Sequence, residues 1–308
     1  MIYSDERIKQ FEPLWGNWYA EELIGEGGYG KVYRIVRNDT GGVYYSACKH
    51  ITIPKNESEI ANARAMGMDD RALYSFFESM AQKILKEIEI MYALRGEANI
   101  VAYEDHMIVN TPGILKWDIF IRMELLIPLT AYMRNNKLPP EEVRRLGIEI
   151  CSALDACASY SIIHRDIKDA NIFLNNRGIY KLGDFGIAKE MNVDSVSVGM
   201  RGTPAYVAPE VYDGRKYDST VDIYSLGILL YKLLNRERYP FLPAAPAPFT
   251  PEDTEKAFAK RMAGEPIPAP VDGDDALRAA VLMACDYDPN GRFATARAMQ
   301  AALRYMGV

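Results

Sequence analysis

The chain has 308 residues, a quarter of them charged, and a net charge of −6. This acidic balance argues against a nucleic-acid partner, because phosphate backbones are bound by basic surfaces. No stretch approaches the roughly 18 consecutive apolar residues of a membrane span, and the charged start MIYSDERIKQ lacks the apolar core of a secretory signal. The four cysteines form no C-x-x-C pair and complete no zinc pattern with the three histidines. We therefore expect a cytoplasmic protein with reduced, buried thiols.

The first 125 residues predict a small, mostly antiparallel sheet with one prominent helix. β-Branched and aromatic residues between glycine-rich turns indicate strands at about 18–26, 29–37 and 43–52. NESEIANARAMGMDD is typical of a short polar helix, and RALYSFFESMAQKILKEIEIMYALRG repeats apolar residues at helical spacing. The runs NIVAYEDHMIV and WDIFIRMELL then indicate two more strands.

After Pro128 the pattern becomes helical. PPEEVRRLGIEICSALDACASYSI opens with two prolines and two acids, a favourable helix start. STVDIYSLGILLYKLLN predicts a more apolar helix, and further helices are predicted at about 251–263, 274–285 and 294–305. There is no internal repeat. The proline-rich stretch 239–250 lies between apolar helical segments, so we interpret it as a loop within one domain.

The stretch LIGEGGYGKVYRI spaces its glycines as G-x-G-x-x-G, a pattern that several kinds of protein use. A dinucleotide fold needs a helix after the glycines and an acid about 20 residues further on. Here the strand-like KVYRIVR follows, and the region around position 50 offers Lys49 and no acid. A P-loop needs Ser or Thr after its lysine, whereas Lys31 is followed by Val32. A hairpin over ATP phosphates and a purely structural hairpin both stay open on these residues alone.

Three further blocks, SIIHRDIKDANIF, YKLGDFGIAK and RGTPAYVAPE, follow in this order. With the glycine loop they resemble the protein kinase family, specifically its serine/threonine branch, and look most like bacterial eukaryotic-like kinases. The resemblance covers roughly residues 15–306. It implies an α+β, bilobal fold with a five-stranded antiparallel sheet and one main helix in a small lobe at about 15–124. A hinge at about 124–128 and a larger, mostly helical lobe at about 128–306 complete it.

The same resemblance implies an ATP site. Lys49 is expected to grip the α- and β-phosphates, with a carboxylate partner for which the family pattern favours Glu87 over Glu89. Met123 is the implied gatekeeper beside the adenine. The residues implied to bind the nucleotide are Gly25, Glu26, Gly27, Gly28, Gly30, Val32, Ala47, Lys49, Met123, Glu124, Leu126 and Phe173.

The resemblance also implies the groups that act on the phosphate. Asp166 would take the proton of the substrate hydroxyl, and Lys168, a serine/threonine signature, would stabilise the transferring phosphoryl group. Asn171 and Asp184 are the implied ligands of Mg²⁺, with Mn²⁺ as an alternative, because hard oxygen ligands suit these ions. Thr203 is expected to hydrogen-bond near Asp166.

Further residues are implied to hold or regulate this site. Glu210 would pair with Arg292, and Asp222 would tie a helix to the catalytic-loop backbone. Arg165 would gather a phosphorylated activation loop. The candidate autophosphorylation sites in that loop are Ser195 and Ser197.

The sequence departs from the family pattern in three places. Lys49 and Glu87 are 38 positions apart, further than is usual, so residues 54–72 are interpreted as an inserted helix or an extension of the partner helix. Decoration of the small lobe and a surface for a homodimer or regulator both remain open for it. Asp169-Ala170 replaces the more frequent Pro-Glu, and neither position is expected to bind metal or phosphate. The acids of arginine-selective kinases correspond here to Thr130 and Lys232, so we expect no strong preference for arginine upstream of the target.

The sequence therefore predicts an active protein serine/threonine kinase that uses ATP, Mg²⁺ and protein substrates. A pseudokinase scaffold is disfavoured, because Lys49, Asp166, Asn171 and Asp184 fill every catalytic position. A small-molecule phosphotransferase is disfavoured by the docking segment GTPAYVAPE. The resemblance to bacterial kinases leaves one more alternative, that the chain is the cytoplasmic part of a longer membrane-anchored protein.

Overall fold

The computed structural model describes residues 6–27, 30–111, 113–185 and 205–305. Four of the predicted site residues, Gly28, Ser195, Ser197 and Thr203, lie outside these ranges. The described chain divides into two compact units. We call residues 6–96 and 101–126 the sheet unit, and residues 97–100, 127–185 and 205–305 the helical unit.

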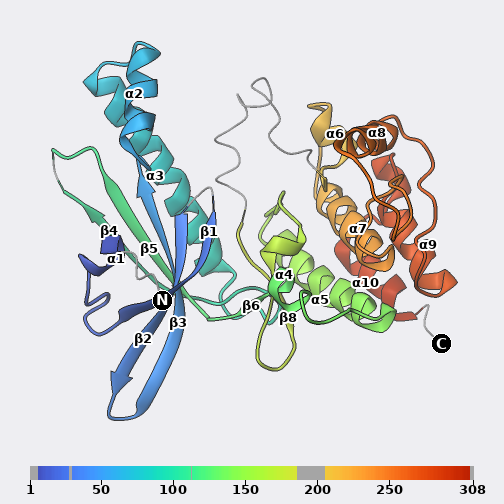
Figure 1. Cartoon of the computed structure of the whole chain (residues 1–308), viewed down its shortest axis with the longest axis horizontal. Helices are drawn as coiled ribbons and strands as arrows, with labels where there is room; N and C mark the ends of the chain where they lie inside the picture. The colour runs from blue at the N-terminus through green and yellow to red at the C-terminus, as the bar shows by residue number, and fades with distance from the viewer. Residues whose placement is uncertain (1–5, 28–29, 112, 186–204, 306–308) are drawn as a thin grey trace. The chain divides into compact units, whose positions relative to one another are not determined.

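The sheet unit contains one antiparallel sheet in the strand order β1-β2-β3-β5-β4 (Figure 1). The five-stranded sheet predicted from the sequence is confirmed, and its strands start or end within a few residues of the predicted limits. Ile119, Phe120 and Ile121 of β5, the strand between β3 and β4, are fully buried. The strands are β1 (Tyr19–Gly27), β2 (Gly30–Asp39), β3 (Gly42–Ile53), β4 (Tyr103–Asn110) and β5 (Trp117–Met123).

The long helix α3 (Asp70–Ala93) packs on β3 and β4. Asp69 caps its N-terminus by accepting a hydrogen bond from the Ala72 amide. The side chains it buries recur at helical spacing, which explains why the apolar pattern predicted it. They are Leu73, Phe77, Ala81, Ile84, Glu87, Ile88 and Met91.

The predicted insertion 54–72 contains a separate helix, α2 (Glu57–Ala65), capped by Asn56. Gly67 has a φ of +90°, a conformation that favours glycine, and it lies in the turn between α2 and α3. Because α3 begins 17 positions before Glu87, the insertion both adds a helix and lengthens the partner helix. The sequence had offered these two outcomes as alternatives.

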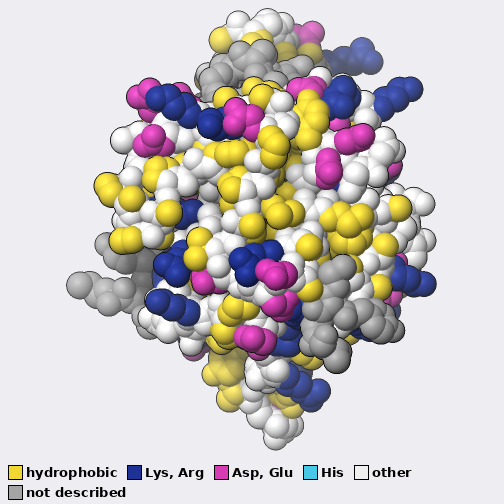
Figure 2. Space-filling view, turned by 90° about the vertical axis from the view of Figure 1, so that its right-hand side faces the viewer, with side chains coloured by type: hydrophobic (Ala, Val, Ile, Leu, Met, Phe, Trp, Pro, Cys, Tyr) yellow, Lys and Arg dark blue, Asp and Glu magenta, His cyan; other side chains and the backbone are white. Residues whose placement is uncertain are grey.

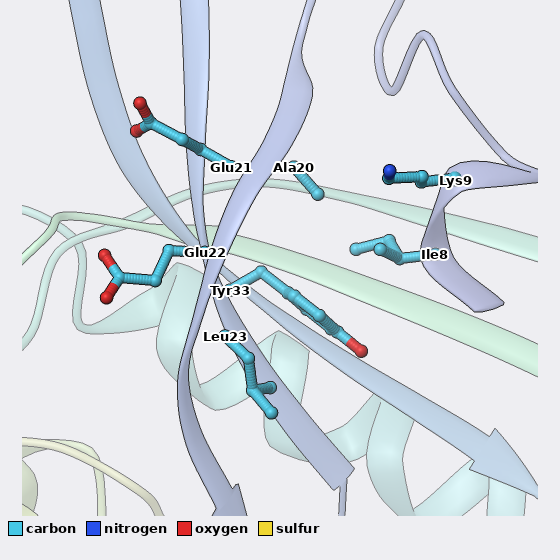
Figure 3. A pocket seen from close by; sticks show the side chains of 7 residues that line it. All are labelled: Ile8, Lys9, Ala20, Glu21, Glu22, Leu23 and Tyr33. Atoms are coloured by element: carbon cyan, nitrogen blue, oxygen red, sulfur yellow. The ribbon is translucent and has the colours of Figure 1, made fainter. Parts of the chain in front are cut away.

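The chain ahead of the sheet packs on the face of the sheet opposite α3. Successive side chains of a strand point to opposite faces, and Cys48 lies under this segment whereas Lys49 points to α3. The buried side chains of the cluster are Ile8, Leu14, Trp18, Tyr33, Ile35, Cys48 and Phe120. Ile8 belongs to the short helix α1 (Glu6–Lys9). Between α1 and β1 lies a pocket of ≈ 10 Å³ (Figure 3), enough for one water molecule at most, so it is no substrate site.

In the helical unit, the helix α7 (Thr220–Leu234) is buried on nearly every side and contacts α5 and α9 (Figure 1). A helix that is apolar all round is typical of a protein interior. Around it lie α5 (Pro140–Ser159), α8 (Pro251–Met262), α9 (Asp275–Ala284) and α10 (Ala296–Tyr305), close to the predicted limits, together with the short α4 (Leu129–Tyr132) and α6 (Pro209–Tyr212).

A small sheet in this unit was not predicted. Its strands are β6 (Ile127–Pro128), β7 (Ile172–Leu174) and β8 (Tyr180–Leu182), too short to show a two-residue period. The segment 97–100 belongs to the same unit, because the Asn99 carbonyl accepts a hydrogen bond from the Leu182 amide and its side chain donates to the Tyr180 carbonyl. The chain segments that precede β7 and follow β8 belong to the site described below.

The surface and the thiols agree with the sequence. On the face shown in Figure 2, acidic and basic side chains are interspersed, without a broad field of one sign. None of the helices in the described residues is long and apolar enough to cross a membrane. The predicted burial of the four thiols is confirmed, and burial raises the pKa of Cys48, Cys157 and Cys285 to about 12, which leaves these thiols protonated and unreactive.

Candidate active site

One face of the sheet unit gathers predicted nucleotide-binding residues. Gly25 lies opposite Val32, and Val32 lies opposite Lys49. Two residues before Lys49 on β3, Ala47 lies opposite Met123 of β5. Residues directly opposite one another in a sheet share a face. The register of three strand pairs therefore places the glycine loop, Lys49 and the end of β5 on a common surface.

Lys49 forms an ion pair with Glu87, as the sequence predicted. The Nζ and Oε1 atoms are 3.7 Å apart, and the two side chains are 13% and 4% exposed. Glu87 lies in the buried stripe of α3, whereas Glu89 faces solvent. A charge at such depth is stable only when it is paired, so each partner fixes the other.

The glycines of the loop differ in what the fold asks of them. A Cβ atom on Gly30 would meet the His50 carbonyl oxygen at 2.3 Å, and the φ of Gly30 is +144°. The sheet itself therefore requires glycine at this position. Among the described residues, a Cβ on Gly27 would meet nothing within 4 Å, and one on Gly25 would make only an ordinary contact with Val32. The fold does not require glycine at these two positions.

Glu124 follows β5 and fastens the end of the sheet. Its amide donates to the Ala102 carbonyl at 3.1 Å, and its carboxylate accepts from the Ala102 amide at 2.6 Å. Leu126 is the last residue of the sheet unit, and Glu26 lies exposed on β1. Phe173, the remaining predicted nucleotide contact, belongs to the helical unit, on β7 opposite Pro128.

In the helical unit, Asp166 lies in a loop that its neighbours hold closely. Lys168 Nζ is 3.0 Å from Asp166 Oδ2, and the Asn171 side-chain amide donates to the Asp166 carbonyl at 2.8 Å. Arg165, just before it, has a φ of +64°, a conformation uncommon outside glycine. The predicted base, the predicted phosphate-stabilising lysine and one predicted metal ligand are therefore brought together.

Asp184 comes to this loop through the small sheet. Ile172 pairs with Leu182, and the Gly183 amide donates to the Asn171 carbonyl at 3.0 Å. His164 Nε2 lies 3.2 Å from the Gly183 carbonyl. These bonds hold the segment that carries Asp184 next to Asn171.

The donor set of Asn171 and Asp184 fits Mg²⁺. The Asn171 NH₂ group is turned toward Asp166, which leaves its side-chain oxygen as the group that a cation could use. Within the described ranges, no group of three or more His, Cys, Asp or Glu could hold a metal ion. Mg²⁺ does not need such a cage, since it keeps several waters and binds one or two protein oxygens together with substrate phosphates.

As predicted, Asp222, in the first turn of α7, is hydrogen-bonded to the backbone of this loop. Its two carboxylate oxygens accept hydrogen bonds from the amides of His164 and Arg165, at 2.7 and 2.8 Å. Burial raises the pKa of Asp222 to about 6, although both backbone donors and the Arg165 charge favour the ionised form. At neutral pH the group is therefore a carboxylate with two fixed donors.

The predicted pairing of Glu210 with Arg292 is also present. Two parallel hydrogen bonds of 2.6 and 2.8 Å join the guanidinium to the carboxylate, and both side chains are almost fully buried. Arg292 also donates to the carbonyls of Thr220, Asp286 and Tyr287. The pair anchors the segment at α6 to the start of α7.

One charged contact was missed from the sequence. Lys232, in the last turn of α7, places its Nζ 2.6 Å from Asp169 Oδ2 and 3.2 Å from Glu237 Oε2. Opposite charges at positions 169 and 232 were the only sequence signal, and nothing in a pattern says that two residues 63 positions apart meet.

The predicted regulatory group is described only in part. The Arg165 guanidinium lies 5.6 Å from the centre of the Tyr217 ring, a favourable cation–π geometry. Its predicted phosphorylated partners, Ser195 and Ser197, lie outside the described residues, as does Thr203.

The comparisons with known proteins point in one direction. A model of the protein kinase domain matches residues 18–303. Serine/threonine-protein kinase 36 from Pongo abelii is 34% identical over 218 residues, 70% of this chain and 14% of that protein. Serine/threonine-protein kinase TIO from Arabidopsis thaliana is 33% identical over 219 residues, with the same shares. The SNF1-related protein kinase catalytic subunit alpha KIN12 of that plant is 28% identical over 264 residues, 85% of this chain and 46% of the relative. The chain thus spans less than half the length of these relatives.

Proposed function

This chain belongs to the protein kinase family, and we propose that it transfers the γ-phosphoryl group of ATP to serine and threonine hydroxyls of proteins. The observation that carries the proposal is the loop at Asp166. It combines a carboxylate, a lysine 3.0 Å away and an asparagine bonded to the loop backbone. Phosphoryl transfer needs this kind of positioning and charge neutralisation more than covalent chemistry.

In the proposed mechanism, the two units divide the work. In the sheet unit, Lys49, oriented by Glu87, holds the α- and β-phosphates, and the face carrying Val32, Ala47 and Met123 receives the adenine. Glycines, which lack a Cβ atom, allow the backbone at Gly25, Gly27 and Gly30 to approach the phosphates closely.

In the helical unit, Asp166 orients the substrate hydroxyl and accepts its proton as the oxygen attacks the γ-phosphorus. Lys168 offers positive charge to the transferring group from its position beside Asp166. Asn171 and Asp184 would hold Mg²⁺, which when bound neutralises charge on the phosphate oxygens.

Several finer assignments belong to the same proposal. We infer Mg²⁺ as the working ion, with Mn²⁺ as an alternative, autophosphorylation at one or both of Ser195 and Ser197 with Arg165 as the receptor, and a cytoplasmic location. The kinship with bacterial eukaryotic-like kinases also stays a prediction, because the relatives named above are eukaryotic. For the insertion that contains α2, decoration of the small lobe and a surface for a homodimer or regulator remain alternatives.

Labelling with γ-³²P ATP tests the proposed function. Incubation of the purified chain with MgATP and a generic protein substrate should place label on phosphoserine and phosphothreonine, detected by phosphoamino-acid analysis. Label found only on small molecules would favour a small-molecule phosphotransferase and contradict the proposal. Peptide mapping of the same reaction checks Ser195 and Ser197, and a peptide array checks for the expected lack of upstream arginine selection.

A further inference from the structure

The first and last turns of the helix α7 form hydrogen bonds with the two ends of the loop 164–171. Asp222, in the first turn of α7, accepts the amides of His164 and Arg165 at the start of the loop. Lys232, in the last turn, donates to Asp169 near the end of the loop. The first contact follows from the family pattern, whereas the second depends on an aspartate where most of the family carries proline.

The contact between Lys232 and Asp169 has the properties of a fixed ion pair. The Nζ and Oδ2 atoms are 2.6 Å apart, and the side chains are only 13% and 20% exposed. Burial would lower the pKa of Lys232, but the hydrogen bond that Lys232 donates to Asp169 and the charges of Asp169, Tyr239 and Glu237 outweigh it and raise the pKa. Lys232 is the one residue of α7 that is only partly buried, and its side chain reaches Asp169 in the loop.

Asp169 is connected directly to the implied metal ligand. It opens the short 3-10 helix Asp169–Asn171, and its carbonyl accepts a hydrogen bond from the Ile172 amide. Asn171, at the end of this turn, donates in turn to the Asp166 carbonyl. A shift of Asp169 would therefore move the Asn171 side chain and loosen the backbone of the base.

The same ion pair lies beside the segment that follows residue 204. The rings of Tyr206 and Tyr239 are in edge contact with centres 5.5 Å apart, and Lys232 Nζ lies 5.6 Å from the centre of the Tyr239 ring. Burial, followed by the neighbouring charges of Tyr239 and Asp169, raises the pKa of Tyr206. The pair is thus largely, though not completely, enclosed by protein groups.

We propose that Asp169 and Lys232 are positioning residues for phosphoryl transfer, which clamp the far end of the catalytic loop to α7 and so fix Asn171. This inference rests on the proposed kinase function. It also implies that Lys232 does not select charged residues in the substrate, because its charge is paired with Asp169 and Glu237.

Steady-state kinetics of Lys232→Met and Asp169→Asn test the clamp. We expect kcat to fall about tenfold to a hundredfold, as small misplacements of reacting groups do, and the Mg²⁺ concentration that gives half-maximal rate to rise severalfold. The KM for the protein substrate should change little. Lys232→Arg, which keeps the charge and the donors, should restore most of the kcat.

Hydrogen exchange gives a readout that does not depend on activity. In the nucleotide-free protein, Lys232→Met should speed exchange of the amides at 169–172 by at least tenfold relative to wild type. Asp275→Asn, which removes the exposed ion pair with Arg278, serves as the matched control and should leave exchange and kcat unchanged. If Lys232→Met does not fold, Asp169→Asn gives the same comparison.

The outcomes separate the clamp from the kinase proposal. Wild-type protein that transfers no phosphate to any protein substrate contradicts the proposed function. Active wild type, with Lys232→Met and Asp169→Asn equal to it in kcat and Mg²⁺ dependence, overturns the clamp alone. A loss confined to the KM of acidic or basic substrates would also overturn it, since Lys232 would then act as a substrate receptor.

Discussion

The two units of this protein position their functional groups in different ways. In the sheet unit, Lys49, Val32 and Ala47 sit on regular strands, and the strand register sets their places. In the helical unit, Asp166 and Asn171 sit in a loop with a residue of positive φ, held by the Asn171 side chain and by the Asp222 side chain, which is distant in sequence.

This difference predicts how each unit responds to substitutions. A strand residue keeps its place while the sheet survives, so a substitution there changes the contact that was removed and little else. A loop held by a few buried polar groups loses its geometry when one of them is lost. We therefore expect substitutions in the helical unit to lower stability and activity together. Substitutions in the sheet unit should change one of the two and leave the other nearly unchanged.

The largest expected effect is in the helical unit, at the buried pair of Glu210 and Arg292. Arg292→Met leaves Glu210 charged and unpaired in the interior, which should lower the free energy of unfolding by about 3–5 kcal/mol. Arg297→Met removes an exposed pair with Asp155 and should cost at most about 1 kcal/mol. Urea unfolding measures both, and equal losses would remove the distinction between the buried and the exposed pair.

The second prediction concerns the pH dependence of the Asp222 hold on the loop. Burial raises the pKa of its carboxyl from 3.8 to about 6 on folding, so the folded protein binds this proton more tightly. Its contribution to stability is therefore complete below about pH 4 and lost as the pH rises through 6. Wild type should lose on the order of 3 kcal/mol relative to Asp222→Asn over this range. A difference that does not change between pH 4 and 7.5 would contradict this.

The third prediction separates two glutamates of the sheet unit. Glu87→Gln should lower kcat/KM about a hundredfold, because Lys49 loses the partner that orients it. Glu89→Gln, two residues away and exposed, should leave kcat/KM unchanged. Kinetics with varied ATP measure both, and equal effects would mean that the ion pair does not orient Lys49.

The smallest effects concern the glycine loop, where fold and function separate within one hairpin. Gly27→Val should raise the KM for ATP by about tenfold and leave the melting temperature nearly unchanged, since a Cβ there meets no atom of the described residues within 4 Å. Gly30→Val should instead lower the stability by about 2 kcal/mol or more, because its Cβ would collide with the His50 carbonyl. The opposite pattern would show that Gly27 is the residue that the sheet requires.

The sequence predicted the contacts that belong to recurring motifs. The five strands followed from alternating patterns, and Glu87 was separated from Glu89 by its place in a family pattern. The pairings of Glu210 with Arg292 and of Asp222 with the loop backbone came the same way. Each depends on residue types at fixed positions, which a sequence displays directly.

The contacts that were missed depend on three-dimensional packing. Asp169 and Lys232 are 63 positions apart, and no spacing rule links them. Ile8 and Leu14 precede the stretch that resembles the family, yet they fill the core beneath β2 and β3. The strands β7 and β8 are too short for a period to emerge. In each case the partner was set by the fold and not by the neighbouring residues.

ATP binding and phosphoryl transfer, measured together in wild type and Asp166→Asn, test the kinase assignment most directly. Calorimetric titration gives the affinity for MgATP, and γ-³²P labelling of a protein substrate gives the rate. We predict an unchanged affinity and a rate lowered by a factor of about 10²–10⁴, the contribution of a positioned base. Wild type that binds MgATP but labels no protein, or Asp166→Asn that labels protein at the wild-type rate, would contradict it.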